Sequence, residues 1–209
     1  LLLSILCIAE LCVNTFLTIY TINENEYYTK REDFNNDIPA VRQRIEELEK
    51  EDPSFWRMET VQQKTTNSPS LYNYRGFTIF SSTSYERTAK LMRALGYHGN
   101  NINSYKYTAS TALLDSLFGI KYILDKNGEQ VDPLLAEVDA TEAGRLYHFD
   151  DALSVGYMMG TGLRSWEPLD RNPFRNQQDL LRAGGVSSDI YQSLPLVDSN
   201  SVGPEDVTE

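Results

Sequence analysis

The sequence predicts a membrane-anchored protein of the α+β class, in which one hydrophobic helix precedes a mixed domain. Residues 1–22 are apolar at all but six positions, and a membrane span needs about 20 mostly apolar residues. Beyond them, helical and strand patterns follow one another without the regular alternation of a doubly wound sheet. We expect a transmembrane helix over residues 1–22, a polar linker over 23–36 and one α+β domain over 37–209.

The hydrophobic segment differs from a secretory signal peptide, which needs a basic start, a shorter apolar run and a small-residue cleavage site. We therefore expect the helix to be retained. The chain opens on Leu1 rather than on Met and closes on a polar run over residues 199–209. We expect it to be a piece of a longer membrane protein, with a domain that is incomplete at its C-terminus.

The charges that follow the helix predict the side of the membrane on which the domain lies. Lys30 and Arg31 are the only basic residues close to the helix end, among Glu24, Glu26, Glu32, Asp33 and Asp37. Cytoplasmic flanks tend to be rich in Lys and Arg, so this flank indicates an extracytoplasmic domain. The net charge of −11 argues against nucleic acid as a partner, because phosphates select basic surfaces.

Four segments of the domain have the periodicity and end signals of helices. The first begins at Asp37, an N-cap residue, and ends before Asp52-Pro53. The second follows Thr83-Ser-Tyr-Glu86, which matches the capping box, and stops at Gly96. The other two are Thr111–Phe118, closed by Gly119, and Phe174–Ala183, which ends at Gly184-Gly185.

Strands are predicted where short apolar or alternating runs are bounded by turn residues. Asn127-Gly128 is a strong hairpin-turn signal, and residues 65–75 read as a loop. The predicted strands are Phe55–Val61, Gly76–Ser81, Ile120–Leu124, Leu146–Phe149 and Ser154–Met159. One core is expected to contain Trp56, Phe77, Leu91, Leu95, Leu114, Ile120, Ile123 and Tyr157.

The sequence offers no catalytic residue that can be assigned. Both cysteines lie in the hydrophobic segment, and the two histidines, His98 and His148, stand outside any helical pair or Cys cluster. We therefore expect no metal and no cofactor in this chain. Nucleophile elbows, phosphate loops and dinucleotide turns are absent. The adjacent Asp150 and Asp151 fit a strand-ending turn better than a carboxylate pair.

Two polar residues, Glu10 and Asn14, share one face of the hydrophobic helix because they are four residues apart. An ionisable residue inside a membrane is costly and usually faces a helix bundle or a water-filled cavity. These residues therefore suggest further transmembrane helices of the same chain as partners. The alternative is that Glu10 lies near a membrane edge and snorkels.

Two loops concentrate hydroxyls, amides, aromatic rings and one arginine each, over residues 67–75 and 81–87. Arginines bind phosphate through charge-assisted hydrogen bonds, and tyrosines stack on sugars or lie at the headgroup level. We expect these loops to face the membrane. The substrate-binding candidates are Arg75, Ser81, Ser82, Tyr85 and Arg87. The alternative is that both loops hold ordinary turns and caps.

Short motifs recur along the chain in a recognisable order and spacing. They are Glu10-Leu11 with Asn14, Phe55-Trp-Arg57, Leu71-Tyr-Asn-Tyr-Arg-Gly76, Phe80-Ser-Ser-Thr83, Leu95-Gly96, Thr111 with Asp115-Ser-Leu-Phe-Gly-Ile-Lys-Tyr-Ile123, Ala152-Leu with Gly156-Tyr-Met158, and Pro173-Phe-Arg-Asn-Gln177. Together they resemble the YfhO family of bacterial membrane proteins, up to about Gly185. The sequence departs from the family at Phe149-Asp-Asp151 and Val155, so the resemblance implies no role for that turn.

The resemblance implies a multi-pass membrane protein similar to GT-C glycosyltransferases. Such enzymes take sugar from an undecaprenyl-phosphate donor on the outer membrane face, and this family is implicated in glycosylating lipoteichoic acid or a related envelope polymer. Their catalytic carboxylate usually lies in the first extracytoplasmic loop, which this chain lacks. We expect a non-catalytic portion of the enzyme whose partners are membrane lipid, the sugar donor, the polymer and the remaining transmembrane helices.

A second hypothesis is a membrane-tethered binding or scaffold module of the cell envelope without chemistry. Glu10 and Asn14 separate the two, because a single-span tether offers no bundle in which to satisfy them.

Overall fold

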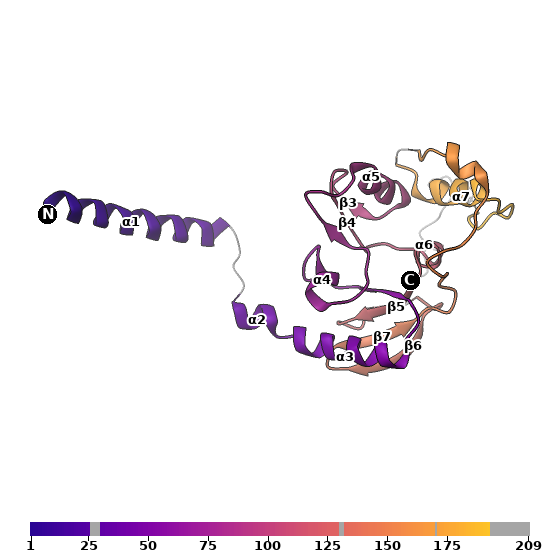
Figure 1. Ribbon diagram of the computed structural model, residues 1–209, viewed down its shortest axis with the longest axis horizontal. Coiled ribbons are helices and arrows are strands. Elements are labelled where there is room, and N and C mark those ends of the chain that lie inside the picture. Colours follow the sequence, from indigo (N-terminus) through magenta and orange to yellow (C-terminus); the bar gives the residue numbers. More distant parts are fainter. Residues whose placement is uncertain (26–29, 130–131, 170, 193–209) are drawn as a thin grey trace, which may run out of the picture. The chain divides into compact units, whose positions relative to one another are not determined.

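The computed structural model describes residues 1–25, 30–129, 132–169 and 171–192 (Figure 1). The expected linker includes residues 26–29, and the polar run 199–209 also lies outside the described residues. The chain divides into two compact units, residues 1–40 and 41–209, which are considered separately.

The first unit contains α1 (Leu2–Asn25) and α2 (Arg31–Asn35). Residues Leu2–Ile22 of α1 are long and apolar enough to cross a membrane. The helix is apolar except at a few positions that include Glu10 and Asn14, and the side chains of residues 2–22 are exposed within the unit. Such a helix needs an apolar surrounding, either lipid or other helices. The short helix α2 occupies part of the segment expected to be a linker.

Helix α3 (Ile38–Glu51) confirms the first predicted amphipathic helix. It buries Val41, Ile45 and Leu48 along one stripe, as the three- and four-residue spacing predicts. Arg44, on the same buried side, lies 2.6 Å from the carboxylate of Asp139 on a neighbouring strand. This ion pair fixes the helix against the edge of the main sheet.

The main sheet has four strands in the order β1-β5-β7-β6, namely Arg57–Thr60, Ile120–Asp125, Gly144–His148 and Ala136–Thr141. Strand β5 is parallel to β1 and antiparallel to β7, and β7 is antiparallel to β6. This mixed pairing, with separate helices, confirms the α+β class.

The expected hairpin at Asn127-Gly128 is wrong. Strand β5 pairs with β1 and β7, so neither of its edges is open to β6, the strand that follows it. The carboxylate of Asp125 accepts hydrogen bonds from the amides of Asn127 and Gly128, at 3.0 and 2.9 Å. This side-chain turn redirects the chain away from the sheet.

A small second sheet has the antiparallel order β2-β4-β3, from Ile79–Phe80, Ser104–Lys106 and His98–Gly99. The predicted strand over Gly76–Ser81 is therefore shortened at its start. The predicted loop over residues 65–75 contains the short helix α4 (Ser68–Tyr72), which begins with Pro69 in its first turn and ends at Asn73 with φ 65°. The expected strand over Ser154–Met159 is irregular instead.

The remaining helices are α5 (Glu86–Leu95), α6 (Ala112–Phe118), α7 (Pro173–Ala183) and the 3-10 turn η1 (Thr161–Ser165). The capping box predicted for α5 is wrong, because its N-cap is Tyr85 without a side-chain cap. The Thr83 hydroxyl pairs with that of Ser81, and Glu86 pairs with Lys90. Helix α6 has the predicted ends, Thr111 and the left-handed Gly119.

The core lies where α5 and α6 meet the main sheet, and it confirms most of the expected residues. Leu95, Leu114, Ile120 and Ile123 belong to one buried cluster, and Phe77 and Leu91 pack against it half-buried. Trp56 is buried with its ring edge-on to Tyr122, 5.3 Å between centroids. The prediction that Tyr157 belongs to the core is wrong, because 40% of the surface of this residue is exposed. Its hydroxyl donates a hydrogen bond to the Leu117 carbonyl.

Candidate functional site

Arg75 lies in a groove beside α4 that residues 73–79 and Glu49 also line. Its guanidinium is 3.2 Å from the Glu49 carboxylate and stands over the rings of Phe55 and Trp56, 5.5 and 5.3 Å from their centroids. This arginine is therefore ion-paired and held by cation–π contacts. Its charge is already compensated within the domain.

A buried glutamate, Glu59 on β1, lies beneath the same groove. One carboxyl oxygen accepts from the amides of Phe77 and Thr78, at 2.6 and 2.9 Å, and the other from the hydroxyls of Thr78 and Tyr74, at 3.0 and 3.4 Å. Burial raises the pKa of Glu59 to about 7, against these hydrogen bonds, which lower it. Both oxygens face protein donors, so the Glu59 carboxyl holds together the turn at residues 74–78; we call this arrangement the Glu59 bracket.

This bracket explains the glycine in the Tyr74-Arg-Gly76 motif. A Cβ atom at Gly76 would lie 2.6 Å from the Glu59 carboxyl oxygen and 2.7 Å from the Pro69 ring. Any larger residue would push the carboxyl away from its donors. Sequence inspection missed Glu59, although a glutamate within a short strand of otherwise buried residues is a signal for such a bracket.

Asp115, in the first turn of α6, is a second buried carboxyl. It accepts from the hydroxyls of Ser110 and Tyr107, at 2.6 and 3.1 Å, and burial raises its pKa to about 6. Both carboxyls thus connect segments of the fold. Among the described residues, no group of three or more His, Cys, Asp or Glu could hold a metal ion.

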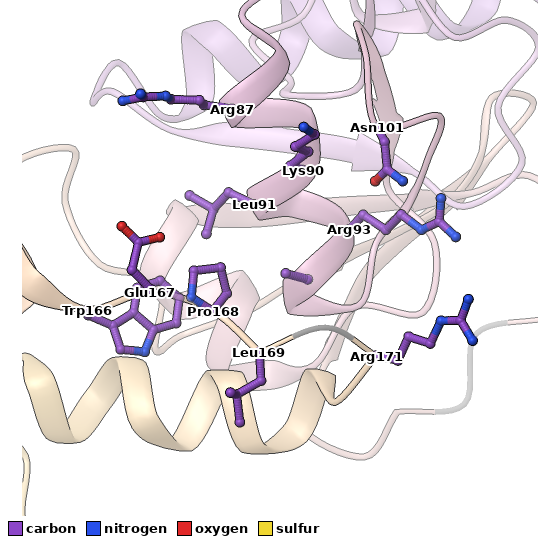
Figure 2. Close-up of a pocket in the computed structure, with 11 residues that line it drawn as sticks. Arg87, Lys90, Leu91, Arg93, Asn101, Trp166, Glu167, Pro168, Leu169 and Arg171 are labelled. Carbon is purple, nitrogen blue, oxygen red and sulfur yellow. The ribbon is translucent and has the colours of Figure 1, made fainter.

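Several positive charges line a pocket of about 720 Å³ between α5 and a wall made of residues 166–169 and Arg171; we name it the α5 pocket. Figure 2 shows the basic side chains of α5 above Trp166 and Leu169. Its lining residues are Arg87, Lys90, Leu91, Arg93, Ala94, Asn101, Trp166, Glu167, Pro168, Leu169 and Arg171. Four cations therefore face one carboxylate, in a chain whose net charge is −11.

Two of these cations have no protein partner in the part of the chain that the structure describes. Lys90 pairs with Glu86 at 2.5 Å, whereas the guanidinium groups of Arg87 and Arg93 form no ion pair or hydrogen bond with the described residues. Like charges three residues apart on a helix repel one another. Arg87 also stands in the first turn of α5, where the helix dipole disfavours a cation.

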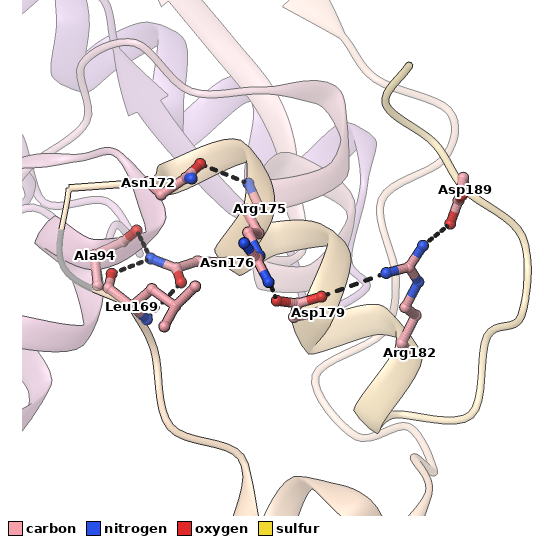
Figure 3. A network of polar contacts seen from close by, with 8 residues as sticks. All are labelled: Ala94, Leu169, Asn172, Arg175, Asn176, Asp179, Arg182 and Asp189. Carbon is pink, nitrogen blue, oxygen red and sulfur yellow. Dashed lines mark hydrogen bonds and ion pairs between the residues drawn. The ribbon is translucent and has the colours of Figure 1, made fainter. Parts of the chain in front are cut away.

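The walls of the α5 pocket are joined by Asn176 on α7, which is 1% exposed. Its side-chain amide donates to the carbonyls of Ala94 and Leu169, both at 2.7 Å, and its carbonyl accepts from the Leu169 amide at 2.7 Å (Figure 3). Ala94 and Leu169 lie on opposite walls of the pocket. Asn176 therefore sets the distance between them.

The neighbouring residue, Gln177, makes a second link between α7 and the end of α5. It donates to the Leu95 carbonyl at 2.7 Å and accepts from the Thr111 hydroxyl at 2.8 Å. The left-handed Gly96 (φ 116°) brings the chain within reach of Pro173, whose Cβ would be 3.2 Å from a Cβ atom at Gly96. Two motifs distant in sequence, Leu95-Gly96 and Pro173–Gln177, thus form one helix junction.

The residues singled out from sequence do not share one pocket. Arg87 lines the α5 pocket and Arg75 the groove beside α4. Ser82 and Tyr85 are exposed, and Ser81 is 3.1 Å from the Thr83 hydroxyl. Glu10 and Asn14 lie on α1, both exposed within their unit.

Sequence inspection did not single out Lys90, Arg93, Trp166 or Arg171, and it found Asn176 only as part of the Pro173–Gln177 motif. The spacing of Arg87, Lys90 and Arg93 along one helix was a visible signal for a basic surface. The opposite wall was not visible, because Trp166 and Arg171 reach the site only through the packing of α7 on α5.

These features define a class of protein: a mixed α+β domain behind an apolar helix that is long enough to span a membrane. The model of the family described as bacterial membrane protein YfhO matches residues 1–206. The chain therefore belongs to the YfhO family of bacterial membrane proteins. No curated protein and no solved structure matches it.

Proposed function

We propose that this chain is the extracytoplasmic portion of a multi-pass glycosyltransferase. The full-length protein transfers sugar from a lipid-phosphate donor, such as an undecaprenyl-phosphate sugar, to an envelope polymer such as lipoteichoic acid. Membership of a bacterial membrane protein family supports this proposal, as do the apolar helix α1 and the acidic flank that follows it.

Within that enzyme, we propose that this domain binds a substrate and does not carry the catalytic residue. A general base must reach the hydroxyl that it deprotonates. Glu59 and Asp115, the carboxyls with raised pKa values, are engaged by protein donors through both oxygens. The catalytic carboxylate is accordingly proposed to lie elsewhere in the same protein.

One observation carries this assignment: the α5 pocket gathers arginines and a tryptophan on an otherwise acidic chain. Arginine matches phosphate in charge and geometry, and an aromatic face beside a polar rim suits a sugar ring. Both groups occur in the proposed donor and in the proposed acceptor.

The test is to delete the gene for the full-length protein in its bacterial host and to measure the sugar content of the envelope polymers. The proposal expects one polymer to lose a sugar substituent, which the restored wild-type gene returns. Unchanged sugar content of every envelope polymer would refute the glycosyltransferase and leave a tethered binding module.

A further inference from the structure

The cations of the α5 pocket are spaced for more than one anionic group. Arg87 and Arg93 are six residues apart on α5, so their backbones are separated by about 9 Å along the helix axis at the usual rise per residue. In the view of Figure 2, their guanidinium groups extend toward opposite sides of α5. This arrangement suits the successive phosphates of one chain better than a single phosphate.

We propose that the α5 pocket binds a phosphodiester polymer of polyol or sugar units, with successive phosphates on Arg87 and Arg93 and one saccharide unit on Trp166. This inference rests on the proposed function for the source of the polymer. It deepens that function, because it assigns the pocket to the acceptor polymer rather than to the lipid donor.

The charge distribution on α5 supports an anionic chain as the ligand. Arg87, Lys90 and Arg93 repel one another at three-residue spacing, and among the described residues only Lys90 of these three has a carboxylate partner, Glu86. Arg171 adds a fourth positive charge from the opposite wall. A bound polyanion would remove this repulsion and would also offset the unfavourable position of Arg87 at the start of the helix.

Trp166 supplies the contact for the carbohydrate. Its side chain is half-buried against the core cluster, and it lines the pocket. Among the described residues, no other aromatic ring is in stacking contact with it. Its packing against the core fixes the indole in place, so stacking a sugar would require little loss of side-chain freedom.

Asn176 is a positioning residue for this site. It contacts none of the proposed ligand groups, yet it holds Ala94 on one wall and Leu169 on the other. Because Leu169 lies between Trp166 and Arg171 in the chain, the hydrogen bonds of Asn176 also set where these two side chains stand relative to α5.

The probe is a synthetic glycerol phosphate oligomer, titrated into the chain in neutral-lipid nanodiscs. Tryptophan fluorescence is a selective signal, because the only other tryptophan is Trp56, which is 2% exposed. Glucose 1-phosphate, with one phosphate, and neutral glycerol serve as comparison ligands. We expect the oligomer to bind more tightly than glucose 1-phosphate, with an affinity that falls as salt rises.

Arg87→Ala and Arg93→Ala should each weaken oligomer binding about tenfold, and Trp166→Ala should reduce affinity for a glucosylated oligomer. Arg164→Ala is the matched control, because Arg164 is an exposed arginine that does not line the pocket. Circular dichroism verifies that each variant is folded.

Unchanged oligomer affinity in the Arg87→Ala/Arg93→Ala double variant would overturn the proposal. Equal affinity for glucose 1-phosphate and for the oligomer would overturn the assignment to a polymer and favour the donor. The proposed function is refuted by a different result, namely that deletion of the full-length protein leaves the sugar content of the polymer unchanged. Specific oligomer binding would then leave the pocket as the site of a tethered polymer-binding module.

Discussion

At the scale of the residue, the two arginines singled out from sequence have different surroundings. Arg75 is ion-paired with Glu49 and stands over two aromatic rings, whereas Arg87 has no protein partner in the described part of the chain. Charge left uncompensated by the protein is available to a ligand. Sequence inspection found both residues but could not rank them, because Glu49 is distant from Arg75 in the chain.

Glu59 is expected to make the stability of the domain depend on pH. Its pKa is raised in the folded state from 4.5 to about 7, so its contribution to stability is fully present below about pH 4.5 and is lost as the pH rises toward 7. The free energy of unfolding should fall by up to about 3 kcal/mol across this window. Denaturant titrations at several pH values measure it.

The variant Glu59→Gln should flatten that part of the pH profile, because glutamine does not titrate. At low pH, where Glu59 is itself neutral, the substitution should cost only about 1 kcal/mol, because the amide and the protonated carboxyl each place a donor group among the same partners. Asp115 contributes a separate fall between its ordinary pKa of 3.8 and about 6. An unchanged profile in Glu59→Gln would show that Glu59 is not the titrating group.

At the scale of the element, α7 is joined to the end of α5 by two buried amides, those of Asn176 and Gln177, and the contribution of Asn176 can be measured. Asn176→Ala would leave three backbone groups of Ala94 and Leu169 without their partner, so we expect a loss of about 3 kcal/mol in unfolding free energy. Asn172→Ala, which removes only the helix cap, should cost about 1 kcal/mol. Equal effects of the two substitutions would contradict the role of Asn176 in joining Ala94 to Leu169.

The elements that could be predicted from sequence are those whose signals are local. Helices α3, α6 and α7 have regular apolar spacing, and Thr111 and Gly119 lie at the ends of α6 as expected. Strand β6 was missed because it is an edge strand with no buried residue, and its short alternating sequence contains Ala, Glu and Asp, which are uncommon in strands. Its pairing with β7 determines its conformation.

Two of the wrong predictions, the capping box of α5 and the hairpin at Asn127-Gly128, arose where a side chain made a different interaction from the one expected. Glu86 bonds Lys90 rather than the start of α5, and Asp125 binds the amides of the Asn127-Gly128 turn. For a related reason, only one wall of the α5 pocket could be predicted from the sequence. Its basic wall follows from helical spacing, but its opposite wall depends on how Asn176 and Gln177 bind the end of α5.

At the scale of the whole molecule, the proposed topology can be tested by proteolysis. If the chain after α1 lies outside the cytoplasm, as its acidic flank indicates, protease added to intact wall-stripped cells should cleave it. A cytoplasmic marker protein, left intact in the same sample, verifies that the membrane is sealed. Full protection of the domain would refute the extracytoplasmic assignment.

The proposal that catalysis takes place in another part of the full-length protein leads to a second expectation. The chain of residues 1–209 alone, in nanodiscs with a lipid-linked sugar and an acceptor polymer, should transfer no sugar, because its buried carboxyls are engaged in the fold. Turnover that one point substitution abolishes would place the chemistry in this domain.

The most direct test of the central claim is the sugar content of the envelope polymer in cells that carry the full-length protein with Arg87→Ala and Arg93→Ala. We predict a several-fold loss of polymer-linked sugar at equal protein abundance, since the pocket would no longer hold the phosphates. Cells with Arg164→Ala should keep the wild-type level. Wild-type sugar content in the double variant would contradict the claim that the α5 pocket serves the transfer.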